Sequence, residues 1–459
     1  MKKTLVIMLA LFLAIPAISY AGSATSRWDL TIGGNVKFDV GWQDQSGAQS
    51  SAMWSGGVVD RNPSAGSTQV YDKYGTQMWG AGETSLNFFV KGPDAWGAHT
   101  HAFILADFTG FWGVAQYSGG PPGAYNTFDL LIATMAFDWE NTTLAMGTGG
   151  GFFGQVPTFS LSSSWNFAGY GGKGAAPVAP QITIEERFTK NWIGGFGVMT
   201  AYNTVNNLPT PGGSSNSTIQ DIYRNPLPAF EGKFAYTSDS CGKVGPWQLL
   251  AELDGFYGQI RHITDWTDAS VTNPTARNKD TDEWYIDFKL LIPIIPEKNG
   301  NKTNALYADG EIWASEGTGL GGNWLANANG TFNNQPGGYP PQGGGFFTND
   351  YERTPGDFHY ATIWGFTTHA QYYFVDNVSF NAFYLWSQVS DMSQAQKVLN
   401  PNAIKGGYQW EANLMYDVNP AIRFTLAWDY SNDQYAFAVP NYKNNGSANA
   451  YRLAAYYFF

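Results

Sequence analysis

The sequence predicts an all-β protein: a transmembrane, antiparallel, up-and-down β-barrel of about sixteen strands. Three observations lead to this fold class. An export signal opens the chain, a two-residue periodicity runs through most of it, and the connections alternate between short and long. The last nine residues, YRLAAYYFF, form a further alternating segment that ends on phenylalanine. Such a strand would expose large apolar groups in a soluble protein, which promotes aggregation.

Residues 1–21 have the pattern of a secretory signal peptide. Lys2 and Lys3 give a basic start, an apolar run follows from Leu5, and Ser19 and Ala21 supply small residues before the cleavage point. The rival interpretation is an uncleaved anchor, but the run is short for a spanning helix, which needs about twenty residues. We expect cleavage after Ala21 and a single barrel domain over residues 22–459.

Composition narrows the class of protein. The formal net charge is -12, and an acidic balance argues against nucleic acid as a partner. The single cysteine excludes an internal disulfide. Abundant glycine and aromatic residues favour strands and turns. After residue 21 no unbroken apolar segment is long enough for a helical membrane protein.

The first mature segment, WDLTIGGNVKFDVGW, sets the pattern. Apolar residues of one parity alternate with polar residues of the other, which places them on opposite faces of a strand. The apolar row is Trp28, Leu30, Ile32, Val36, Phe38, Val40 and Trp42. The run exceeds an average soluble strand and suits a tilted strand that crosses a bilayer, which needs about nine to eleven residues.

Similar apolar rows recur along the chain. They begin near Trp96, Trp192, Trp284, Tyr360, Val378, Tyr408 and Ile422. Two registers stay open. The segment 128–139 is apolar on both faces, and in 181–188 the apolar row would carry Glu186.

The connections fall into two sets. Short ones lie near 91–95, 138–142, 189–191, 238–246, 293–304, 375–377 and 417–420. Long ones lie near 43–83, 109–127, 147–180, 203–228, 258–282, 314–357, 388–407 and 431–449. Short periplasmic turns and long extracellular loops, with both termini on the short-turn side, are typical of bacterial barrels. A soluble β-sandwich or β-helix would explain alternation and export, but not the many exposed aromatic rows.

With these features the sequence resembles the Gram-negative outer-membrane porins. The resemblance implies a location in the cell outer membrane, contact with its lipid, and a homotrimer. In that family the terminal strand is the signal that the barrel-assembly machinery recognises. Here the matching residues are Tyr451, Leu453, Ala455, Tyr457 and Phe459.

The resemblance also implies that the third long connection, 147–180, folds into the lumen and narrows it. Its constriction candidates are Phe152, Phe153, Phe159, Trp165 and Lys173. This segment departs from the general-porin pattern, because Lys173 is its only charged residue and acidic residues are absent. The charge at a constriction would then come mainly from the barrel wall.

The polar parity supplies candidates for the pore lining. They are Lys37, Asp39, His101, Asp107, Glu252, Asp254, Asp287, Lys289, His369, Glu411, Arg423 and Arg452. Acids outnumber bases on this parity, and carboxylates raise the local concentration of cations. We therefore expect a water-filled channel for passive diffusion of ions and small hydrophilic solutes, with a mild cation preference. For any one residue, a solvated wall charge without an individual role is the common alternative.

Enzymatic function is not expected. None of the five histidines has a neighbouring serine or carboxylate that marks a general base. His99 and His101 share a strand face, but two ligands without a third make a weak metal signal, so we expect neither metal nor cofactor. Two alternatives stay open. Aromatic residues in the loops and lumen suit a channel selective for sugars or other polar solutes, and a structural barrel could sheathe a partner protein.

Overall fold

The structure is a computed structural model. It describes residues 28–44, 76–81, 84–107, 129–152, 178–199, 227–264, 276–316, 349–350, 359–360, 362–390, 404–438 and 440–459. The predicted signal peptide, 1–21, lies outside the described residues. Within the described part of the chain, no helix is long and apolar enough to cross a membrane.

A closed antiparallel barrel of sixteen strands confirms the predicted fold class. Its first half consists of β1 (Asp29–Gln43), β2 (Thr76–Gly80), β3 (Ser85–Lys91), β4 (His99–Asp107), β5 (Asp129–Asp138), β6 (Thr142–Gly150), β7 (Val178–Arg187), β8 (Trp192–Met199) and β9 (Ala229–Ser238). The second half consists of β10 (Leu249–Thr264), β11 (Ala276–Ile295), β12 (Leu306–Glu316), β15 (Thr362–Val375), β16 (Val378–Val389), β17 (Ile404–Asn419), β18 (Ile422–Tyr435) and β19 (Asn445–Phe458). Both β2 and β3 pair with β1, so they are two parts of one barrel strand.

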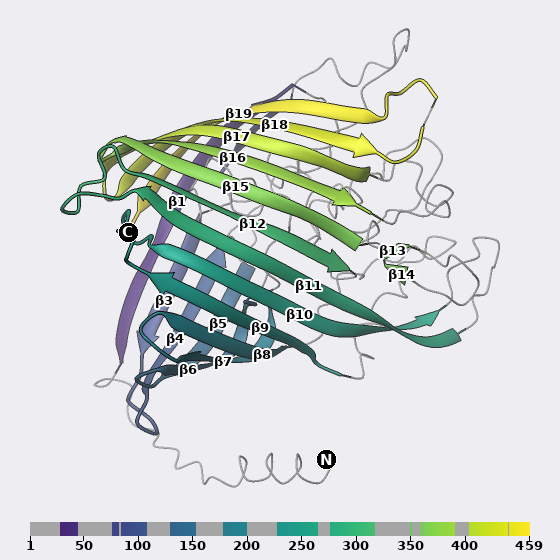
Figure 1. The fold of residues 1–459 in the computed structure, drawn as a ribbon. Coiled ribbons are helices and arrows are strands. Elements are labelled where there is room, and N and C mark those ends of the chain that lie inside the picture. Colours follow the sequence, from purple (N-terminus) through teal and green to yellow (C-terminus); the bar gives the residue numbers. More distant parts are fainter. Residues whose placement is uncertain are drawn as a thin grey trace.

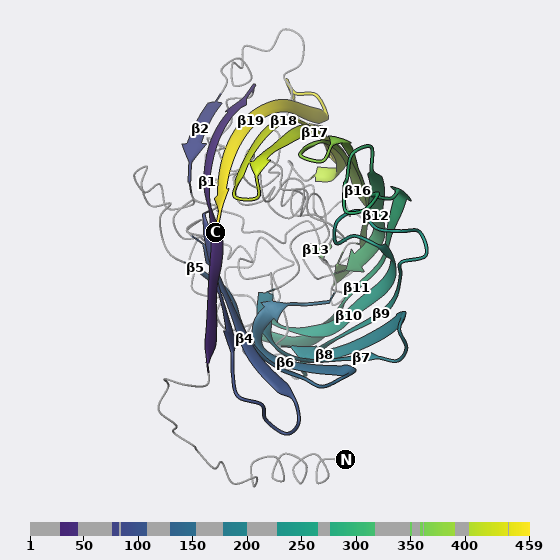
Figure 2. The ribbon, with the colours of Figure 1, turned by 90° about the vertical axis from the view of Figure 1, so that its left-hand side faces the viewer.

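The barrel closes where β1 pairs with β19, so the first strand contacts the last (Figures 1 and 2). Every other strand pairs with its neighbours in chain order. The short strands β13 (Asn349–Asp350) and β14 (His359–Tyr360) form a separate two-stranded sheet. Closure leaves neither terminal strand with an unpaired edge, which a barrel in lipid requires.

The connections follow the predicted alternation. The short ones are 92–98, 139–141, 188–191, 239–248, 296–305, 376–377 and 420–421. They lie at the end of the barrel that holds the C-terminus (Figure 1). The strand ends that flank the long connections lie at the opposite end of the barrel.

The outer face carries the predicted apolar rows. On β1, Leu30, Ile32 and Val36 are 58%, 53% and 50% exposed, whereas Lys37 on the other parity is fully buried. Near the long-connection end, rings of neighbouring strands contact each other, as in Trp364–Trp386 and Trp410–Trp428, with centroids 4.6 and 4.0 Å apart. Exposed aromatic rows of this kind are typical of the membrane–water boundary.

The structure defines which residues face outward in the two segments that the sequence leaves ambiguous, 128–139 and 181–188. On β5 an extra residue, Leu131, bulges from the pairing with β4, because Leu105 pairs with Ile132 and Ala106 with Leu130. A bulge inverts parity, so Leu130 and Met135 both face outward although one is even and the other odd. On β7, Glu186 does share the outer row, close to the strand end, where it accepts a hydrogen bond from Thr142.

The C-terminal row also faces outward. Tyr451, Leu453, Tyr457 and Phe459 are each about half exposed. Phe459 is fixed to β1 by two backbone hydrogen bonds with Gly34, of 3.1 and 3.2 Å. Gly34 has a φ of 152°, and a Cβ there would lie 2.2 Å from the Ser85 carbonyl oxygen. Only glycine fits this point of the closing seam.

We predict that Gly34→Ala weakens the barrel, because the added methyl group clashes with the Ser85 backbone and strains φ, at a cost of about 1–3 kcal/mol. The check is the temperature at which the folded band converts to the unfolded one in electrophoresis. Gly255→Ala is the matched control, since its Cβ would meet nothing closer than 3.7 Å. Equal transition temperatures for the two variants would contradict the prediction.

Candidate functional site: the inner wall of the barrel

The inner wall follows directly from the register of the strands. Each inward row pairs with the next, for example Glu252 with Lys289, Lys289 with Glu311, and Glu411 with Asp429. Charged side chains of the described inner wall concentrate on β9–β12 and β17–β19. This concentration makes the wall the candidate functional site.

Lys289 on β11 is the centre of the largest ionic cluster. Its ammonium group lies 2.9 Å from Glu252 Oε1 and 3.8 Å from Asp287 Oδ2, and it forms an ion pair with Asp254. The Lys289 side chain is only 2% exposed, and those of Asp254 and Asp287 are fully buried. Charges buried this deeply persist in a fold only when they are paired. The cluster brings together four predicted pore-lining residues.

Phe152 packs against the inner wall next to the Lys289 cluster. Its backbone N–H donates to Glu231 Oε2 (2.7 Å), and its carbonyl accepts a hydrogen bond from Lys289 Nζ (3.2 Å). Lys233 Nζ lies 4.6 Å from the centroid of the Phe152 ring. Gly195 on β8 leaves room for the ring, since a Cβ there would lie 2.9 Å from Phe152 Cε2.

Phe152 is the second residue after β6, where the third long connection begins. Its contacts with β9 and β11 show that the connection starts inside the barrel. The other constriction candidates, Phe153, Phe159, Trp165 and Lys173, lie outside the described residues.

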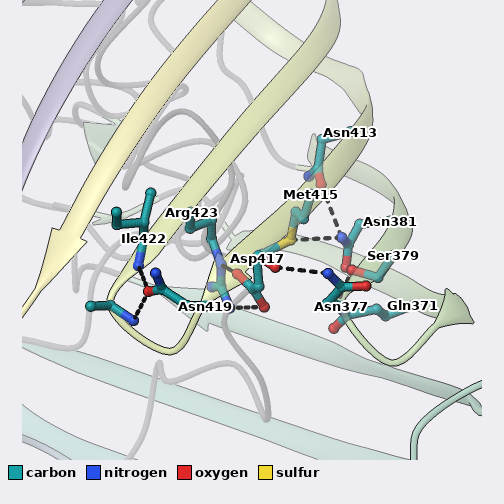
Figure 3. Close-up of polar contacts among 11 residues, drawn as sticks. Gln371, Asn377, Ser379, Asn381, Asn413, Met415, Asp417, Asn419, Ile422 and Arg423 are labelled. Carbon is teal, nitrogen blue, oxygen red and sulfur yellow. Dashed lines mark hydrogen bonds and ion pairs between the residues drawn. The ribbon is translucent and has the colours of Figure 1, made fainter.

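A series of polar contacts crosses four strands at mid-wall. His369 Nδ1 lies 2.7 Å from Asp309 Oδ2, and its Nε2 lies 3.1 Å from Asn381 Oδ1. Asn381 donates to Asn413 Oδ1 (2.9 Å), and Asn413 donates to Glu411 Oε1 (2.6 Å). Figure 3 shows Asn381 between Asn413 and the sulfur of Met415. The series of polar contacts fixes side chains of β12, β15, β16 and β17 in one orientation.

The series of polar contacts continues toward the closing seam between β1 and β19. Glu411 pairs in register with Asp429 on β18, and Arg452 Nε on β19 lies 2.9 Å from Asp429 Oδ2. All three side chains are buried. The Arg452 guanidinium therefore offsets the charge of the Asp429 and Glu411 carboxylates at this end of the series of contacts.

A second group lies at the short-turn end. Arg423 binds Asp417 through two hydrogen bonds, of 2.5 and 2.9 Å (Figure 3). The Arg423 guanidinium lies 5.5 Å from the Phe458 ring, which stacks on Tyr456. Lys37 Nζ lies 5.4 Å from the Tyr456 ring. These contacts account for Phe458, whose inward position the sequence alone leaves unexplained.

The remaining predicted pore-lining residues also map to this wall. His101 on β4 lies 2.8 Å from Asp138 and contacts the Phe89 ring. Asp39 and Asp107 lie on inward positions of β1 and β4, but their side chains are outside the described part of the chain. Sequence reasoning missed Asn381, Asn413 and Gln371, which carry no charge. Their inward parity was the available signal.

Burial is uneven around the inner wall. On β11, β16 and β17, the inward side chains at mid-wall are buried, as Lys289, Asn381 and Glu411 illustrate. On β3–β5 most inward side chains stay partly exposed, as Phe89 and Phe103 illustrate. Solvent inside the barrel therefore contacts the β3–β5 side more than the side opposite.

We predict that Lys289→Met destabilises the barrel by about 3–5 kcal/mol, because it leaves buried carboxylates without their cation. The melting transition of the purified protein in detergent is the measurement. Lys190→Met serves as control, since the Lys190 side chain is 81% exposed. A Lys289→Met transition as high as that of the control would contradict the ion-pair assignment.

Comparison with known proteins agrees with this architecture. No family model matches the chain, and no curated protein matches its sequence. Among solved structures, the outer membrane channel DcaP of Acinetobacter baumannii matches with a TM-score of 0.63 at 12% identity, covering 95% of this chain and 99% of that one. The anion-selective porin from Comamonas acidovorans matches with a TM-score of 0.51 at 10% identity, covering 94% and 100%. The chain has the fold of the outer-membrane porins, whose apolar outer wall suits a location in the outer membrane.

Proposed function

We propose that the protein is an outer-membrane channel for passive diffusion of ions and small hydrophilic solutes, with a mild cation preference. The observation that carries the proposal is the charged inner wall of a closed barrel whose outer wall is apolar. An apolar exterior suits lipid, and a charged interior suits water and ions. No catalytic step, metal or cofactor is part of the proposal.

Whether the proposed channel prefers cations or anions depends on the charged side chains of the inner wall. Inward carboxylates of the described wall are Asp29, Asp138, Glu185, Glu231, Glu252, Asp254, Asp287, Asp309, Glu311, Glu411, Asp417 and Asp429. Inward cations are Lys37, Lys91, Arg187, Lys233, Lys289, Arg423 and Arg452. The surplus of acids favours cations. The anion-selective porin shares the fold, so the fold alone does not set the sign.

The third long connection is proposed to narrow the lumen. Phe152 supports this, since its contacts with Glu231 and Lys289 hold the start of the connection against the inner wall. The five constriction candidates then act together with wall charges such as Lys233. We also propose cleavage of residues 1–21, assembly through the terminal strand by the barrel-assembly machinery, and a homotrimer in lipid.

A substrate-selective channel is the second candidate function. Its support is the set of partly exposed aromatic rings on the inner wall, such as Phe103 and Tyr373, with Lys302 Nζ 4.9 Å from the Tyr373 ring. Aromatic faces beside hydrogen-bonding groups suit sugars and other polar solutes. Saturable block of conductance by one solute would favour this function, and co-purification of a partner without conductance would favour a sheath.

We predict that the purified protein conducts ions in planar bilayers. Its reversal potential in a KCl gradient should have the sign that a higher permeability for K⁺ than for Cl⁻ produces. Glu185→Gln should reduce that preference, because it also frees the paired charge of Lys233. Glu186→Gln is the control, since the neighbouring carboxylate faces outward. Anion preference in the unaltered protein would overturn the proposed selectivity.

We predict that deleting Phe459 lowers the amount of folded protein in the outer membrane. The deletion removes the terminal aromatic group and both backbone hydrogen bonds to Gly34. Quantification of the heat-modifiable band in outer-membrane fractions is the measurement, with Phe459→Tyr as control. Normal levels of the truncated barrel would show that this residue has no role in assembly.

A further inference from the structure

An apolar patch lies on the inner wall, where a channel for hydrophilic solutes would have polar side chains. It consists of Phe89, Phe103, Leu105 and Ile132, on three neighbouring strands. Phe89 pairs with Phe103, and Leu105 with Ile132, so the four side chains are contiguous. We call this set the inner apolar patch.

The inward direction of the patch is fixed by the register. Phe88 pairs with Ile32, and Met135 pairs with Ala102; Ile32 and Met135 are 53% and 50% exposed on the outer face. The intervening positions of β3, β4 and β5 therefore face the interior. All four patch side chains are partly exposed. Large apolar groups that remain accessible together commonly mark a site of binding.

The opposite wall supplies charge. In the ring of sixteen strands, β4 and β12 are eight positions apart, so they face each other across the barrel. Figure 2 shows β4 and β5 on one side and β11 and β12 on the other. Asp309 and Glu311 face inward from β12, and Asp287 and Lys289 from β11. One wall is apolar and partly exposed, and the other carries a surplus of carboxylates, most of them buried.

We infer that the inner apolar patch is a contact site for small organic cations that carry an aromatic or alkyl face. The apolar face of the solute packs on Phe103 and Leu105, while the carboxylate surplus of the remaining wall attracts its charge. This inference rests on the proposed function for the sign of the charge. It adds a substrate class, since a fully hydroxylated sugar or a bare ion gains nothing from the patch.

The test compares benzylammonium with ethanolammonium, which has the same charge and no apolar ring, as blockers of KCl current through single channels. We expect benzylammonium to half-block at a roughly tenfold lower concentration, as burial of about 55 Å² of apolar surface would give. In the double variant Phe103→Gln, Leu105→Gln the two blockers should differ by less than about twofold. Phe103→Leu is the matched control and should keep most of the difference.

Several results would overturn the inference. These are equal block by the two ammonium ions, a difference that survives the double variant, and block by benzoate as strong as block by benzylammonium. If the double variant fails to fold, Ile132→Thr tests the same patch with a β-branched replacement and should lower the difference between the blockers. KCl current without the expected block overturns this inference alone, whereas absence of KCl current overturns the proposed channel as well.

Discussion

The closing seam between β1 and β19 is the constraint on which the rest of the structure depends. In lipid no water is available to bind an unpaired N–H or carbonyl group, so an open sheet edge is prohibitively costly. The pairing of Val36 with Tyr457 and of Trp42 with Tyr451 removes that edge. Gly34 lies at this seam, bound to Phe459 by two backbone hydrogen bonds, and its missing side chain lets the Ser85 carbonyl of β3 approach from the other side.

Closure of the barrel turns the two-residue alternation of apolar and polar side chains into two walls. The outer wall contacts lipid, and the inner wall faces the interior of the barrel. The outer wall exposes side chains such as Leu30 and Leu453, which lipid accommodates at no cost. The inner wall collects charges that would be costly in lipid, and Lys289 shows how it holds them. Its buried ammonium group is compensated by carboxylates from β10 and β11 and by the Phe152 carbonyl. The same contacts attach the third long connection to the wall, so the ionic cluster and the proposed constriction are linked physically.

The inner wall is also divided around its circumference. From β12 to β19, hydrogen bonds and ion pairs such as those of His369, Asn381 and Arg452 fix buried polar side chains against each other. From β3 to β5 the wall is partly exposed and includes an apolar patch. A rigid polar side and an accessible apolar side give the barrel an amphipathic interior, which is the physical basis of the proposed discrimination among solutes of similar size.

The sequence by itself determined the strands, their number, and the face on which most residues lie. Period-two alternation is local, so Lys37, Lys289 and Arg452 could be assigned to the interior from their neighbours in the chain. Only the tertiary structure decided which of them meet. The pairing register brought Lys289 to Glu252 and Arg452 to Asp429, while the Leu131 bulge inverted the parity of one strand. Partners such as Phe152 and Glu231 are far apart in sequence. No local pattern specifies such a contact, because it forms only when the barrel brings the two segments together.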